Sequence, residues 1–131
     1  NFFHTIYEFI LIILYLIASP LQFLIPSQKN HAQTNKPTVI FLHGWYTQYP
    51  IYYPLISKLH RLGYDIHLPN LGYHARPTHK IVRQLHVYIK KHQLTNIIII
   101  GHSFGGIIAL AYAQKYPKDI TQIITIASPF H

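Results

Sequence analysis

The sequence contains no cysteine and only three acidic side chains among its 131 residues. The absence of cysteine excludes disulfides, cysteine-zinc sites and thiol nucleophiles, and it leaves the redox compartment open. Serine is therefore the default nucleophile for covalent chemistry. A catalytic serine needs a base and usually a carboxylate that orients this base. The scarcity of acids narrows the choice of that carboxylate to Glu8, Asp65 and Asp119.

Basic side chains are abundant by comparison. Eleven Lys and Arg residues give a formal net charge of +8, and eleven histidines add to it in acid. The basic residues are scattered over expected helices and loops, which favours a solvated basic face over a nucleic-acid site. No nucleic-acid partner is therefore expected, and of the two partner surfaces considered an anionic membrane or interface is the better candidate, as an alternative to the solvated face. Half of the residues are hydrophobic, enough for one domain with a proper core.

A hydrophobic segment occupies residues 1–26, and Phe9 to Ala18 are consecutively apolar. Its length of about twenty residues is near the span of a bilayer. Three interpretations compete: the apolar region of a secretory signal, an uncleaved membrane anchor, and an apolar helix packed on the domain. No small-x-small cleavage site follows Ala18, which favours the anchor. The segment predicts a membrane-anchored or secreted protein of unknown orientation, with a polar linker at 27–37.

Short apolar runs alternate with longer amphipathic runs from residue 38 onward. The alternation predicts an α/β fold with right-handed crossovers and a parallel sheet that carries helices on both faces. Gly63 is expected to end the first helix, and Thr78 is expected to cap the second. The predicted strands are 38–42, 64–68, 96–100 and 120–127, and the predicted helices are 51–62, 78–92 and one that follows Ser103 and ends near Pro117.

The run Gly101-His102-Ser103-Phe104-Gly105 lies between the third predicted strand and the third predicted helix. A serine at the centre of Gly-x-Ser-x-Gly in this setting indicates a nucleophile on a tight strand-to-helix turn. The turn is so close that the positions two before and two after the serine must be tiny, which Gly101 and Gly105 satisfy. The alternative is a coincidental glycine-rich turn. His102 is expected to pack under the turn.

The run His43-Gly44-Trp45 follows the first predicted strand. Ligands of open parallel sheets bind beyond the carboxyl ends of the strands, so this loop should lie beside Ser103. Gly44 lets the backbone bend close to a substrate, and the backbone amide of Trp45 is a candidate oxyanion donor. The amide of Phe104, at the positive end of the third helix, is the second candidate. His43 is expected to brace this loop.

These motifs resemble those of the α/β-hydrolase family, and within it the lipases and carboxylesterases. The resemblance runs from Pro37 to His131 and includes Ala127-Ser128-Pro129-Phe130-His131, which is similar to the Ser-Pro-x-His loop of many lipases. It implies that 38–131 is the N-terminal part of an α/β-hydrolase domain. It also implies an ester or lipid substrate, no cofactor, and Ser103 as the acyl-enzyme nucleophile. The chain departs from many members at Thr47, where they carry a second glycine.

The order of catalytic residues in this family places the acid and then the histidine after the serine. Downstream of Ser103 only Asp119 and His131 are available. Asp119 precedes the fourth predicted strand, so it should lie at the opposite side of the sheet and suits a helix-to-strand turn. His131 falls on the correct edge, where a loop role is favoured over that of the base. His74 is kept as a candidate substrate-facing residue beside the alternative of a solvated loop, and no metal site is indicated.

The sequence therefore predicts the front part of a serine ester hydrolase, with the triad acid and base expected beyond His131. The chain alone should show little turnover. Two alternatives remain open: a non-catalytic, membrane-anchored remnant of the fold, and acyl transfer or thioester hydrolysis on the same scaffold.

Overall fold

The structure is a computed structural model that describes residues 36–45, 47, 49–72 and 76–130. The predicted hydrophobic segment 1–26 and nearly all of the linker 27–37 lie outside the described residues, as do His74 and His131. The predicted N-terminal apolar helix is therefore not among the elements found. In the part of the chain that is described, no helix has both the length and the apolarity needed to cross a membrane.

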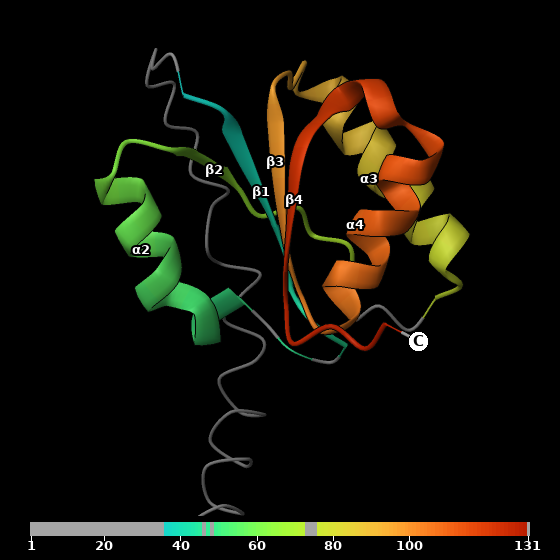
Figure 1. The fold of residues 1–131 in the computed structure, drawn as a ribbon, viewed down its shortest axis with the longest axis horizontal. Helices are drawn as coiled ribbons and strands as arrows, with labels where there is room; N and C mark the ends of the chain where they lie inside the picture. The colour runs from blue at the N-terminus through green and yellow to red at the C-terminus, as the bar shows by residue number, and fades with distance from the viewer. Residues whose placement is uncertain (1–35, 46, 48, 73–75, 131) are drawn as a thin grey trace, which may run out of the picture.

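Four parallel strands form the centre of the described fold: β1 (Thr38–Leu42), β2 (Asp65–His67), β3 (Ile97–His102) and β4 (Ile120–Ile126). Their order across the sheet is β2-β1-β3-β4 (Figure 1). Leu42 pairs with Gly101, and His102 pairs with Ile126, so the carboxyl ends of β1, β3 and β4 meet at one edge. The predicted parallel α/β architecture is confirmed.

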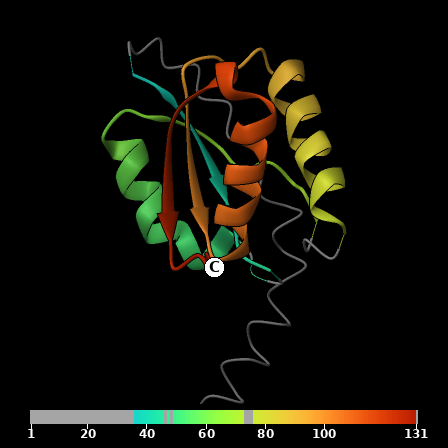
Figure 2. The same cartoon turned by 45° about the vertical axis from the view of Figure 1, so that its right-hand side comes forward.

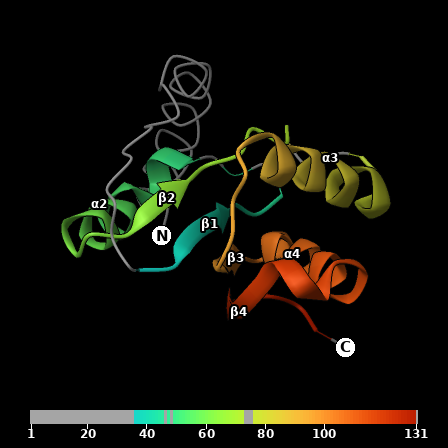
Figure 3. The same ribbon diagram turned by 90° about the horizontal axis from the view of Figure 1, so that it is seen from above.

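Helices cover both faces of this sheet. The helical elements are η2 (Tyr49–Tyr52), α2 (Tyr53–Arg61), α3 (Thr78–Lys91), α4 (Phe104–Lys115) and η3 (Pro117–Asp119). The helix α2 covers one face, whereas α3 and α4 lie side by side on the other (Figures 1 and 3). Figure 2 shows β4 at the edge of the sheet, beside β3 and α4.

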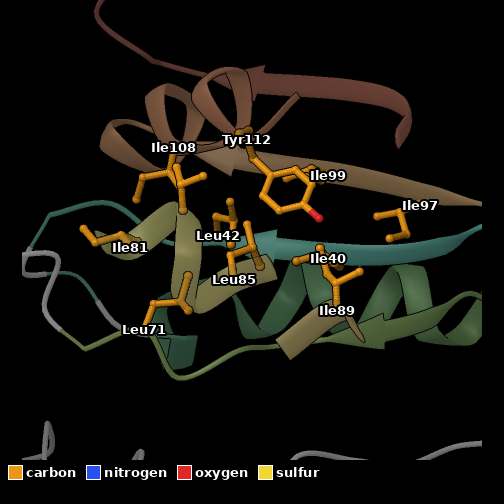
Figure 4. Close-up of a cluster of buried hydrophobic side chains, with 12 residues drawn as sticks. Ile40, Leu42, Leu71, Ile81, Leu85, Ile89, Ile97, Ile99, Ile108 and Tyr112 are labelled. Atoms are coloured by element: carbon orange, nitrogen blue, oxygen red, sulfur yellow. The ribbon is translucent and has the colours of Figure 1, made fainter. Parts of the chain in front are cut away.

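The alternation of side chains along the buried strands divides the core into two clusters. Ile40 and Leu42 point toward α3 and α4, where they pack with Leu85 and Tyr112 (Figure 4). Val39 and Phe41 of the same strand point toward α2. Both sides of β1 are thus buried, as its unbroken apolar sequence predicts.

Parts of the predictions for the two amphipathic helices are wrong. The predicted helix 51–62 is divided into η2 and α2, and Leu55 and Leu62 of its predicted apolar stripe are exposed. Gly63, with φ +82°, ends this helix as predicted. Thr78 was expected to cap α3 but is its first residue. The cap position belongs to Pro77, whose carbonyl accepts hydrogen bonds from two amides of the first turn.

Candidate active site

Ser103 occupies a strained turn between the last residue of β3 and the first residue of α4. Its φ of 52° and ψ of −122° lie in a region that side chains other than glycine rarely adopt. The Ser103 amide donates a hydrogen bond to the Ile126 carbonyl at 2.8 Å, and the Ser103 carbonyl accepts one from the Gly106 amide at 3.0 Å. The end of β4 and the first turn of α4 therefore hold the strained conformation in place.

The glycines on either side of Ser103 leave no room for a side chain. A Cβ atom at Gly105 would collide with the Leu42 carbonyl oxygen and would lie 2.7 Å from that of His43. A Cβ atom at Gly101 would lie 2.6 Å from the carbonyl carbon of Gly105. The turn is therefore in direct backbone contact with the end of β1, which is the physical requirement that the sequence motif predicted.

His43 is buried at the end of β1 and contacts the predicted oxyanion loop. Its side chain is 4% exposed, and its Nδ1–H donates a hydrogen bond to the Gly44 carbonyl at 2.8 Å. Its ring meets that of Tyr49 edge-on at 4.9 Å. Burial lowers the pKa of His43, and the hydrogen bond to Gly44 offsets only part of this effect. His43 is thus a neutral donor near pH 7.

Gly44 brings the loop after β1 against the nucleophile turn. A Cβ atom built on Gly44 would lie 3.2 Å from the Ser103 Cβ. Trp45 follows with its indole 60% exposed, whereas Phe104 begins α4 and packs partly against the core. The two predicted oxyanion donors therefore belong to segments that meet at Ser103.

Two tyrosines near this edge were not predicted from the sequence. The Tyr52 hydroxyl is hydrogen-bonded to His102 Nδ1 at 2.8 Å, so His102 points under the turn, toward η2. The Tyr49 hydroxyl donates to the Pro69 carbonyl at 2.8 Å, and burial raises its pKa well above the usual value. The tyrosine-rich stretch between Trp45 and Tyr53 was the only available signal, and it does not indicate which carbonyls or rings are reached.

Asp119 lies at the opposite end of the sheet. It ends η3, immediately before β4, whereas Ser103 follows the carboxyl end of β3. Its Oδ1 accepts a hydrogen bond from Lys90 at 3.1 Å, and its Oδ2 accepts one from the Tyr112 hydroxyl at 3.0 Å. Desolvation would raise the pKa of Asp119, but these hydrogen bonds outweigh it and lower the pKa. The placement matches the predicted helix-to-strand turn.

The described residues hold no group of three or more His, Asp or Glu side chains that could bind a metal ion. The predicted substrate-facing residues His74 and His131 lie outside the described residues, so both remain predictions.

The family model for the alpha/beta hydrolase fold matches residues 37–131. A pimeloyl-[acyl-carrier protein] methyl ester esterase of Shewanella woodyi is 35% identical over 95 residues, which cover 69% of this chain and 35% of that protein. A 1-acylglycerol-3-phosphate O-acyltransferase of Arabidopsis thaliana is 26% identical over 109 residues, which cover 74% of this chain and 26% of that protein. The chain thus spans about a third or less of these relatives.

A solved structure shows the same arrangement of strands and helices. An extracellular alpha/beta-hydrolase from a Paenibacillus species superposes with a TM-score of 0.63 at 25% identity, covering 72% of this chain and 43% of that one. The region that the family model matches, residues 37–131, includes β1 to β4 and the turn at Ser103. On the fold, the tight turn at Ser103 and the match over residues 37–131, the chain belongs to the alpha/beta hydrolase family.

Proposed function

We propose that this chain carries the nucleophile of a serine ester hydrolase of the lipase or carboxylesterase type, and that Ser103 forms the acyl-enzyme. The observation that carries the proposal is the strained backbone of Ser103, which is held between two glycines and packed against Gly44. Strain at a non-glycine residue persists only where the surrounding structure enforces it, and it concentrates at functional sites. The same turn presents the serine in other α/β-hydrolases.

The proposed reaction has two halves, and the predicted donors act in the first. Ser103 Oγ attacks the ester carbonyl carbon while a general base takes its proton, and the carbonyl oxygen becomes an oxyanion. The backbone amides of Trp45 and Phe104 stabilise this charge, and each is expected to contribute about 3 kcal/mol. The C–O bond then breaks, and the alcohol leaves with the proton. Water hydrolyses the acyl-enzyme in the second half of the reaction.

The general base and its carboxylate are assigned to residues beyond His131. Asp119 does not serve, because it lies at the amino end of β4 and both of its carboxylate oxygens already accept hydrogen bonds. His43 does not serve either, because it is buried and its Nδ1–H is committed to Gly44. The 131-residue chain alone should therefore show only the weak catalysis, roughly 10³ to 10⁴ over water, that binding and the oxyanion hole supply without a triad.

The substrate class proposed is a carboxylic ester with an acyl chain, including a lipid. The Shewanella relative is named for cleaving a methyl ester, which supports hydrolysis. The net charge of +8 favours substrates presented at an anionic interface. A membrane-anchored or secreted location agrees with this, and the Paenibacillus structure is that of an extracellular protein.

Acyl transfer is the second candidate function. The Arabidopsis relative is named an O-acyltransferase, and the acyl-enzyme on Ser103 could pass its acyl group to an alcohol instead of water. Thioester hydrolysis uses the same intermediate with a thiol leaving group. A non-catalytic remnant of the fold is the alternative from another class.

A fluorophosphonate probe tests the proposal. The full-length gene product should be labelled at Ser103, Ser103→Ala should not be labelled, and Ser128→Ala should be labelled at the wild-type rate. Ser128 is a matched control because it is a second serine close to the start of α4 but outside the turn. Its Cβ lies 2.8 Å from the position that a Cβ on Gly106 would take. Failure of the wild-type protein to react would establish the remnant. Adding a soluble alcohol and measuring the new ester separates transfer from hydrolysis.

A further inference from the structure

Three polar side chains connect the loop after β1 to the nucleophile turn, and the proposed reaction does not use them. The Thr47 and Tyr52 hydroxyls lie 3.1 Å apart, and the Tyr52 hydroxyl lies 2.8 Å from His102 Nδ1. Tyr52 is 9% exposed, and its ring lies 5.3 Å from the imidazole of His102. We refer to Thr47, Tyr52 and His102 as the hydroxyl chain.

Both ends of the hydroxyl chain touch Gly44. A Cβ atom built on Gly44 would lie 3.1 Å from the Thr47 hydroxyl oxygen, 3.3 Å from His102 Nδ1 and 3.2 Å from the Ser103 Cβ. The hydroxyl chain and the serine therefore converge on the side of Gly44 to which a Cβ would point. Because these groups lie together beside Gly44, a shift of the hydroxyl chain would alter the contacts that hold Gly44 beside Ser103.

The loop that carries Trp45 is closed by Thr47. The Thr47 amide donates a hydrogen bond to the Gly44 carbonyl at 3.3 Å, so Gly44 to Thr47 form a turn with Trp45 inside it. The direction of the Trp45 amide depends on how this turn is seated. The Thr47 hydroxyl is hydrogen-bonded to that of Tyr52, which in turn is hydrogen-bonded to His102, the residue next to Ser103.

We propose that Thr47, Tyr52 and His102 are positioning residues that fix the separation between the Trp45 amide and Ser103. This inference rests on the proposed function, because it concerns the oxyanion site of that reaction. A hydroxyl both donates and accepts, so Thr47 and Tyr52 donate in series to Nδ1 when His102 carries its proton on Nε2. The chain is thus satisfied internally and needs no charged group.

The test measures the rate constant of inactivation (kinact) and the half-saturating concentration (KI) of a fluorophosphonate on the full-length gene product. Tyr52→Phe keeps the ring but removes the central hydroxyl, so kinact should fall about ten-fold, since small misplacements of catalytic groups carry large rate penalties. KI should stay within two-fold. Tyr112→Phe is the matched control: it removes the hydroxyl of another buried tyrosine, at the other end of the sheet, and kinact should not change.

Conservative variants distinguish positioning from general structural support. Thr47→Val and His102→Leu break the chain and should each lower kinact, whereas Thr47→Ser and His102→Asn keep a polar atom at the same place and should restore most of it. Because one break disables the whole chain, Tyr52→Phe combined with Thr47→Val should be no slower than Tyr52→Phe alone, within two-fold.

The outcomes separate this inference from the proposed function. If wild-type Ser103 does not react, the proposed function is overturned. If wild type reacts and Tyr52→Phe has the same kinact as Tyr112→Phe, Ser103 remains the nucleophile and the positioning role is overturned. The same conclusion follows if the effects of Tyr52→Phe and Thr47→Val multiply, because independent effects contradict a connected chain.

Discussion

The two ends of the parallel sheet in this α/β-hydrolase are built in opposite ways. At the carboxyl end, backbone packs on backbone: Gly105 touches the end of β1, and Ser103 is strained between β3 and α4. At the amino end, long polar side chains meet: Asp119 accepts hydrogen bonds from Lys90 and Tyr112. The first arrangement is costly in conformational energy. The second gives each carboxylate oxygen of Asp119 a hydrogen-bond donor.

The difference shows which features mark the site in this chain. A perturbed pKa often identifies a functional group, yet the lowered pKa of Asp119 belongs to an ion pair far from the nucleophile. His86 joins this cluster, because its Nδ1 lies 3.1 Å from the Tyr112 hydroxyl, and its ring stacks on Tyr116 at 3.7 Å. Ser103 has instead a conformation that only its surroundings can enforce. Burial also shifts the pKa of His43 beside Gly44, and Gln93 and Asn96 also have positive φ, so neither a shifted pKa nor a positive φ alone distinguishes the two ends.

The largest expected effect on stability comes from adding one methyl group at the carboxyl end of the sheet. Gly105→Ala places a Cβ against the carbonyl oxygens of Leu42 and His43, which are backbone atoms and cannot rotate away. We expect a loss of about 3 kcal/mol in the free energy of unfolding, at the upper end of overpacking effects, together with loss of probe labelling. Chemical denaturation followed by circular dichroism measures the change.

Gly72→Ala provides the control for this prediction. Gly72 also has a positive φ, of 74°, but nothing lies within 4 Å of a Cβ built on it. Its substitution should cost only about 1 kcal/mol, the backbone contribution alone. Equal losses for the two variants would contradict the close packing of β1 on the nucleophile turn.

A change at the amino end should act on stability without touching reactivity. Asp119→Asn removes the charge that Lys90 and Tyr112 stabilise, and we expect a loss of about 1.5 kcal/mol at pH 7, at the lower end for hydrogen bonds to charged groups because the site is partly solvated. The labelling rate of Ser103 should not change. A change in that rate would contradict the separation of the two ends.

The stability difference between wild type and Asp119→Asn should depend on pH. The folded state lowers the pKa of Asp119 from its ordinary value of 3.8, so its contribution is complete above that value and is lost as the pH falls through the folded pKa. The difference between wild type and Asp119→Asn should therefore be constant from pH 7 to about pH 5 and should shrink in stronger acid. A difference that grows in acid would reverse the assignment.

The smallest expected effect has the opposite sign. Ser103→Gly removes the side chain that makes the turn unfavourable, since glycine adopts positive φ freely. The strain relieved exceeds the extra chain entropy that glycine loses on folding, so we expect a gain of about 1 kcal/mol and complete loss of labelling. Thermal unfolding of the two proteins measures it. A destabilised Ser103→Gly variant would indicate that the turn is not strained.

Local features of the sequence predicted much of this fold and part of the site. The unbroken apolar run of β1 predicted a strand buried on both faces, and the spacing of Gly101 and Gly105 predicted a turn too tight for side chains. Both depend on neighbours within a few residues. The strand and the turn could therefore be predicted without knowledge of the rest of the chain.

Features that depend on distant neighbours were not predictable. The spacing of apolar residues in α2 predicted an apolar stripe, but this stripe is wider than the surface that the sheet covers. Leu55 and Leu62 therefore remain exposed, whereas Ile56 and Leu59 pack against the core. The bond between Tyr52 and His102 joins residues fifty positions apart. Nothing in the local sequence encodes such a pairing.

The bond from the Ser103 amide to the Ile126 carbonyl has a consequence for synthesis of the protein. Residues emerge from the ribosome in order, and domains fold as their segments become available. The first turn of α4 supplies one of the two backbone hydrogen bonds that hold Ser103, but the other cannot form until β4, the last strand in the described part of the chain, has paired with β3. Ser103 therefore takes its final conformation only after β4, at the edge of the described sheet, has been synthesised and has paired with β3.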